Sequence, residues 1–120
     1  MKGQCQVVIV HLSPQDSVAI ISTGPAQVPH QPLGLLVQFY PYSGLGDTLR
    51  LRHLAFGLWQ QLRSHIDSAG TPWVVLQATD QTPGPHTGVW QVHNFGFVIL
   101  KHDDGRWYQL HDTIPFEHPQ

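Results

Sequence analysis

The chain has 120 residues, of which 41% are hydrophobic, and this is the size and apolar content of one globular domain. Only 12% of the residues are charged, with six basic residues against eight acidic ones, which argues against a nucleic-acid partner because such binding depends on neutralising phosphates. A single cysteine excludes an internal disulfide, and no apolar run approaches the roughly 20 residues of a membrane span, so we expect a cytoplasmic protein without a membrane partner.

Three strands are expected in the first third of the chain. Residues 6–12 (QVVIVHL) and 17–22 (SVAIIS) are rich in β-branched residues and are separated by a Ser-Pro turn signal. Residues 33–40 (LGLLVQFY) form a similar run that ends at Pro41. Residues 24–32 hold three prolines and should form a surface loop.

The apolar period then changes to steps of three and four, which predicts one long amphipathic helix over about residues 47–68. Its apolar stripe comprises Leu51, Leu54, Ala55, Leu58, Trp59, Leu62 and Ile66. Asp47 is suited to accept hydrogen bonds from the free amides of the first turn, and Gly70 supplies a stop signal. Gly57 inside the helix costs about 1 kcal/mol relative to Ala, a cost that the close approach of a strand would explain.

The second half of the chain again has the pattern of strands. Residues 73–79 form an apolar run, residues 80–88 have the composition of a loop, and residues 88–110 are long enough for two or three strands with a bend or bulge at residues 94–96. We therefore expect an α+β fold in which a curled, mostly antiparallel sheet of about six or seven strands, in the order β-β-β-α-β-β-β, packs on the helix. The whole chain should be a single domain with an irregular tail at residues 112–120.

A β-hairpin is expected where Asp103, Asp104 and Gly105 separate two apolar runs, with Gly105 in the left-handed conformation. If His102 pairs with Arg106, one face of the hairpin carries apolar residues and a tyrosine, and we expect it to be the core face: Val98, Leu100, Tyr108 and Leu110. The candidate interface residues on the other face are Phe97, Ile99, Trp107 and His111. Because one helix covers one face of a sheet, the second face must be covered by curling of the sheet, by a second chain, or by a ligand or partner protein.

Nine histidines raise the question of a metal site. The spacing argues against one, because the four histidines of the second half lie seven to nine residues apart, without the close pairs that preset two ligands: His86, His93, His102 and His111. Cys5 and His11 would lie about 20 Å apart along a strand and so do not form a nucleophile and base. We expect no metal, no cofactor and no catalytic residue.

The segment before the helix has two glycines at the helix N-terminus, where free amides and the helix dipole attract anions. The candidate residues for an anion site or a pocket there, together with one from the second half of the chain, are Tyr40, Tyr42, Asp47, Arg50 and His93. The alternative is an ordinary turn between a strand and a well-capped helix.

Two functions are compatible with these features. The first is a small non-enzymatic interaction protein, of the immunity, antitoxin-like or accessory kind, that binds a protein partner or forms a homodimer through a sheet face. The second is a small-molecule-binding or enzymatic domain with a cavity between the helix and the curled sheet, lined by Tyr40, Tyr42, Arg50, His93 and Trp107. We favour the first because the charge is low and the sequence contains no catalytic constellation.

Overall fold

The computed structural model describes residues 8–42, 45–83, 88, 90–110 and 116. In this part of the chain it contains one helix and six strands: β1 (Val8–His11), β2 (Ser17–Ala26), β3 (Gly34–Tyr40), α1 (Thr48–Ala69), β4 (Trp73–Pro83), β5 (Trp90–Lys101) and β6 (Trp107–Gln109). The predicted element order and α+β class are confirmed. The predicted tail at residues 112–120 lies outside the described residues, except for Phe116.

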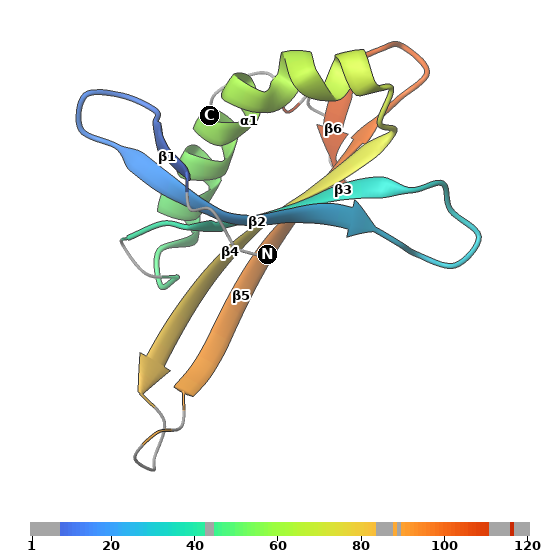
Figure 1. The fold of residues 1–120 in the computed structure, drawn as a ribbon. Helices are drawn as coiled ribbons and strands as arrows, with labels where there is room; N and C mark the ends of the chain where they lie inside the picture. Colours follow the sequence, from blue (N-terminus) through green and yellow to red (C-terminus); the bar gives the residue numbers. More distant parts are fainter. Residues whose placement is uncertain (1–7, 43–44, 84–87, 89, 111–115, 117–120) are drawn as a thin grey trace, which may run out of the picture.

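The six strands form one curled sheet whose spatial order follows the chain, from β1 to β6 (Figure 1). Neighbouring strands are antiparallel, apart from β3 and β4, which are parallel. A parallel pair needs a long crossover connection, and α1 provides it between the end of β3 and the start of β4. The helix therefore lies across one face of the sheet (Figure 1).

The helix α1 begins and ends where the sequence signals place it. The Asp47 carboxylate accepts a hydrogen bond of 3.1 Å from the Arg50 amide, and Gly70 takes the left-handed conformation, with φ of 71°, that ends the helix. Its buried side chains are Leu51, Leu54, Ala55, Phe56, Leu58, Trp59 and Ile66. The predicted stripe omitted Phe56 and included Leu62, which is only partly buried.

Gly57 lies where the segment after β1 approaches the helix. A Cβ atom at this position would lie 3.2 Å from Leu12 Cδ1 and 3.3 Å from Leu12 Cβ. The glycine therefore allows Leu12 to pack directly on the helix, which accounts for a residue that is otherwise unfavourable in a helix interior.

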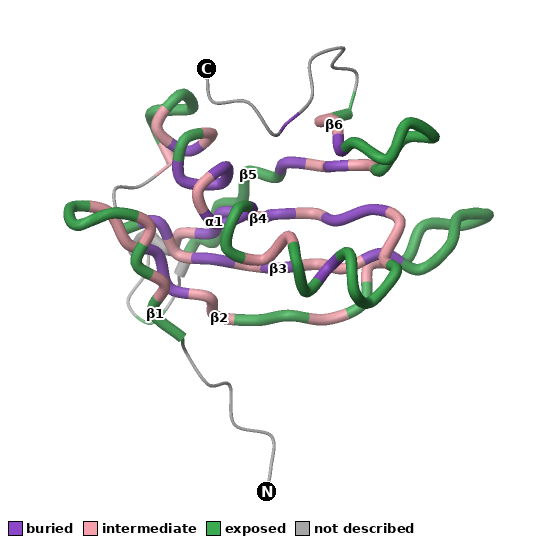
Figure 2. The backbone as a smooth tube through the Cα atoms, turned by 90° about the horizontal axis from the view of Figure 1, so that it is seen from above, coloured by how far each residue is buried: buried purple, intermediate pink, exposed green. Residues whose placement is uncertain are grey.

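An aromatic cluster joins the helix to the last strand. The Trp59 ring lies 4.8 Å from the Trp107 ring and 6.4 Å from the Phe116 ring, and Phe116 lies 5.6 Å from Phe56. Trp107 Nε1 also donates a hydrogen bond of 3.1 Å to Asp67 Oδ1 on α1. The four aromatic rings belong to the buried core, and Figure 2 shows that buried residues lie along the helix and the central strands of the sheet.

The strands β4 and β5 are longer than the sequence predicts. They pair along their whole lengths without a register shift, so no bulge interrupts residues 94–96, and the part of the predicted loop that covers residues 80–83 is wrong. Each strand supplies the other with hydrogen-bond partners throughout, and the hairpin extends beyond the part of the sheet that the helix covers (Figure 1). The register shift in this sheet lies in β2, between Ile20 and Ser22.

Candidate functional site

The hairpin of β5 and β6 has the predicted turn and register. The His102 amide donates a hydrogen bond of 2.9 Å to the Arg106 carbonyl, and Gly105 has a φ of 82°. Lys101 pairs with Trp107 as this register requires. The prediction of which residues share a face of this hairpin is therefore confirmed.

The predicted interface residues of this hairpin lie in the core instead of on a surface. Phe97, Ile99 and Trp107 face α1 and have exposed fractions of 3%, 0% and 0%, while His111 lies outside the described residues. The prediction failed because alternation defines two faces of a strand but does not say which one a helix covers. The deciding contact is long-range: Trp107 packs against Trp59 of α1.

The opposite side of the sheet, here called the outer face, carries the residues that alternate with the core residues. Two rows of side chains cross the central strands in register on this face: Leu36, Val75 and Val98 in one row, and Trp73, Leu100 and Tyr108 in the other. All of them except the buried Trp73 are half-buried, and Leu110 beyond the end of β6 is 46% exposed. The helix lies over the other face (Figure 1).

The outer face is free of formal charge among the described strand residues. The described strands contain two residues of formal charge, Asp80 and Lys101. The alternation of side chains along the strands places both on the side of α1. Next to the apolar rows, Gln38 Nε2 donates a hydrogen bond of 2.7 Å to Gln77 Oε1. The outer face thus combines apolar side chains with amides that pair with each other.

Trp73 fixes one end of the outer face. Its Nε1 donates a hydrogen bond of 2.7 Å to the Pro32 carbonyl, and its ring lies against Gly34. A Cβ atom at Gly34 would lie 2.5 Å from two ring atoms of Trp73 and 2.8 Å from its carbonyl oxygen. A side chain at position 34 would therefore displace the ring, so the glycine is needed for this contact.

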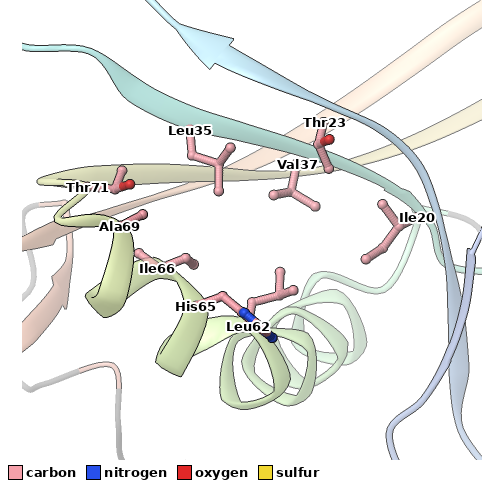
Figure 3. A pocket seen from close by; sticks show the side chains of 9 residues that line it. All are labelled: Ile20, Thr23, Leu35, Val37, Leu62, His65, Ile66, Ala69 and Thr71. Carbon is pink, nitrogen blue, oxygen red and sulfur yellow. The ribbon is translucent and has the colours of Figure 1, made fainter.

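A cavity of about 270 Å³ lies on the helix side of the sheet, between the second half of α1 and the strands β2 and β3 (Figure 3). Its apolar walls come from both layers: Ile20, Leu35, Val37, Leu62, Ile66 and Ala69. Thr23, His65 and Thr71 complete the lining with polar groups. The residues predicted to line a cavity between helix and sheet do not line this one. The observed lining could have been predicted in part from the sequence, because residues 62, 65, 66 and 69 have the spacing of one face of a helix.

Asp47 and Arg50, predicted to bind an anion, contact other groups of the protein. Asp47 caps the helix, and the Arg50 guanidinium forms an ion pair with Asp16 in the turn between β1 and β2. The hydrogen bond from Arg50 holds the pKa of the Asp16 carboxyl below its usual range, and the Arg50 charge and a hydrogen bond from Ser13 act in the same direction. This geometry supports a structural role, since it ties the turn to the first turn of α1.

The other predicted pocket residues lie in two places. The rings of Tyr40 and Tyr42 are 4.8 Å apart and nearly perpendicular, at 79°. Tyr42 is 54% exposed, and its φ of 63° is unusual for a bulky residue. His93 lies opposite Asp80 in the hairpin of β4 and β5. The predicted residues therefore form separate contacts on different elements.

Within the described residues, no group of three or more His, Cys, Asp or Glu side chains is arranged to hold a metal ion. In the same part of the chain, no helix has the length and apolar character needed to span a membrane. The chain matches no protein-family model, no curated protein and no solved structure. Among the described residues, the outer face and the cavity are the features that best support a function.

Proposed function

We propose that this protein is an interaction module that associates with a second copy of itself through the outer face of its sheet. The observation that carries the proposal is the in-register row of Leu36, Val75 and Val98, which is apolar, half-exposed and on the face opposite the helix. Contiguous apolar surface of this kind marks interaction sites more often than isolated exposed residues do.

The lack of charge favours a second copy as the occupant. In a symmetric dimer the same patch meets itself, so any net charge on the patch would repel its own copy. The described strand residues of the outer face carry no formal charge, and the Asp104 carboxylate that binds the Tyr108 hydroxyl lies in the turn beyond β5 and β6, away from the row of Leu36, Val75 and Val98. The centres of protein interfaces are depleted of charge in the same way. With 12% charged residues in the whole chain, repulsion between copies is also weak overall.

Packing of one sheet on another would bury both rows of the outer face. Two sheets pack about 10 Å apart, with side chains from the two facing layers interdigitating. The aromatic residues Trp73 and Tyr108 lie in the second row, and such residues are enriched at interface centres. Trp73 is held in place by Pro32 and Gly34, so little side-chain freedom is lost there on association.

The test is the oligomeric state of three proteins in sedimentation velocity: wild type, Val75→Lys and Gln60→Lys. Val75 lies at the centre of the apolar row, and a lysine there would be buried without a partner in the dimer. Gln60 is exposed on α1, so Gln60→Lys makes the same change of charge away from the outer face. We expect wild type and Gln60→Lys to dimerise and Val75→Lys to be monomeric with an unchanged circular dichroism spectrum.

The proposal is overturned if wild type is monomeric at every concentration tested, or if folded Val75→Lys dimerises as wild type does. The membership in an immunity, antitoxin-like or accessory class stays a prediction from the sequence.

A further inference from the structure

The cavity beside α1 exists because the two halves of the helix pack differently against the sheet. In the first half, Leu58 is completely buried and Gly57 lets Leu12 approach the helix backbone. In the second half, Leu62 is only partly buried and Ala69 is exposed. The last turns of the helix therefore leave space above β2 and β3 that side chains of the described residues do not fill (Figure 3).

We propose that this cavity binds a small, uncharged and mostly hydrocarbon molecule of about ten non-hydrogen atoms. The size follows from the volume: an apolar cavity of about 150 Å³ holds benzene, and this one measures about 270 Å³. Scaled in proportion, the space accommodates roughly ten to eleven carbon-sized atoms.

The walls determine the chemistry of the ligand. Apolar side chains of the helix face apolar side chains of the strands across the cavity, so a hydrocarbon body would be covered on both sides. The polar groups belong to residues at the surface, since Thr23 and His65 are exposed and Thr71 is half-buried. A single hydroxyl or carbonyl group on the ligand can hydrogen-bond there while the hydrocarbon part stays inside.

The electrostatics favour a neutral ligand over an anion. No Lys, Arg, Asp or Glu is present among the described residues that line the cavity, so an ammonium group would find no counter-ion there, and a carboxylate would find only the exposed side chain of His65 at the mouth. The cavity also lies beside the C-terminal turns of α1, where the aligned peptide dipoles place partial negative charge. A ligand carboxylate would therefore be repelled and partly desolvated without compensation.

This site is independent of the proposed self-association, because the cavity and the outer face lie on opposite sides of the sheet. Binding can be followed residue by residue through the methyl resonances of Ile20, Leu35, Val37, Leu62 and Ile66. The methyl groups of Leu36, Val75 and Val98 on the outer face serve as internal controls in the same spectra.

The experiment is a methyl NMR titration of the wild-type protein with 1-butanol, 1-hexanol and 1-octanol. We expect saturable shifts at the cavity methyl groups, with affinity rising about fourfold for each added methylene, the factor that corresponds to about 0.8 kcal/mol. Octanoate, which has the eight carbons of 1-octanol but ends in a carboxylate, should bind at least about tenfold more weakly because its charge would be desolvated beside the C-terminal end of α1.

Two variants complete the test. Ala69→Phe fills the cavity from an exposed helix position and should abolish 1-octanol binding, whereas Ser68→Phe adds the same bulk at the neighbouring exposed position outside the lining and should bind as wild type does. The proposal is overturned if the outer-face methyl groups shift as much as the cavity groups, if the shifts do not saturate, if octanoate binds as tightly as 1-octanol, or if Ala69→Phe retains wild-type affinity. Failure of the outer-face proposal would leave each of these outcomes unchanged.

Discussion

The two faces of the sheet are built from alternate residues of the same strands, yet they are buried to different extents. Val74 and Ile99 face α1 and have no exposed surface, whereas their chain neighbours Val75 and Val98 on the outer face are half-buried. The residue types are nearly the same on both sides. Burial in this protein is therefore decided by where the helix lies and not by the apolar character of a face.

Charge separates the two faces more clearly than hydropathy does. The face under the helix tolerates Lys101 at its edge because the ammonium group lies 3.7 Å from Asp67 of α1 and 6.0 Å from the Trp107 ring centroid. The outer face has no helix above it to supply such partners, and its described strand residues carry no formal charge. A mixed pattern can therefore belong to the core face, and a uniformly apolar pattern can belong to a surface.

The largest expected effect compares adjacent residues on the two faces. Ile99→Ala removes a side chain with 0% exposure and should lower the free energy of unfolding by about 2–5 kcal/mol, because it leaves a cavity in the core. Leu100→Ala, one residue along β5 but on the half-buried outer face, should cost about 1 kcal/mol. Urea unfolding followed by tryptophan fluorescence, at protein concentrations where the chain is monomeric, measures both.

Equal losses in these two variants would contradict the assignment of the faces. A larger loss for Leu100→Ala than for Ile99→Ala would mean that the helix covers the face that the sequence first suggested.

The second comparison lies on the outer face itself and concerns two glycines on neighbouring strands. Gly34→Ala should destabilise the protein by about 1–3 kcal/mol, because the added Cβ would lie 2.5 Å from the Trp73 ring. Gly24→Ala is the matched control, since a Cβ there meets nothing within 4 Å, and it should change stability by less than about 0.5 kcal/mol. Thermal and urea unfolding measure the difference, and a harmless Gly34→Ala would show that the Trp73 ring is not fixed.

The features that the sequence predicts well are those set by local chemistry. Asp47 and Gly70 define the ends of α1 through a side-chain cap and a left-handed residue, and Gly105 defines the hairpin register. Each of these depends on contacts within a few residues, so the residue type alone carries the information.

The features that the sequence misses depend on residues far apart in the chain. Trp107 is buried because it contacts Trp59 and Asp67, and the alternation of residues along β6 does not predict either contact. The cavity is similar, since it depends on how far the end of α1 stands from Leu35 and Val37. The sequence therefore predicts that one apolar face of the sheet is left uncovered by the helix, but it assigns the core residues of the last hairpin to that face and the outer-face residues to the core.

The smallest expected effect tests how the helix is held over its face, through the ion pair of Asp16 with Arg50. The pKa of Asp16 is lowered in the folded protein, chiefly by the hydrogen bond from Arg50. A lowered folded-state pKa contributes stability above the unfolded value of about 3.9, and this contribution is lost as the pH falls through the folded-state pKa. Asp16→Asn should therefore be less stable than wild type near neutral pH, and the gap should narrow below about pH 4.

Asp104 provides the matched comparison at the far end of the sheet. The Tyr108 hydroxyl donates a hydrogen bond of 2.6 Å to its carboxylate, and this bond is the main cause that lowers the pKa of Asp104. Asp104→Asn should show the same direction of pH dependence, although the Asp104 carboxylate joins two residues of one hairpin, whereas Asp16 joins a turn to the helix.

If urea unfolding curves of wild type and Asp16→Asn keep a constant separation from pH 7 to about pH 2.5, the ion pair does not hold the helix on the sheet, and the apolar contacts of α1 alone select the face that it covers.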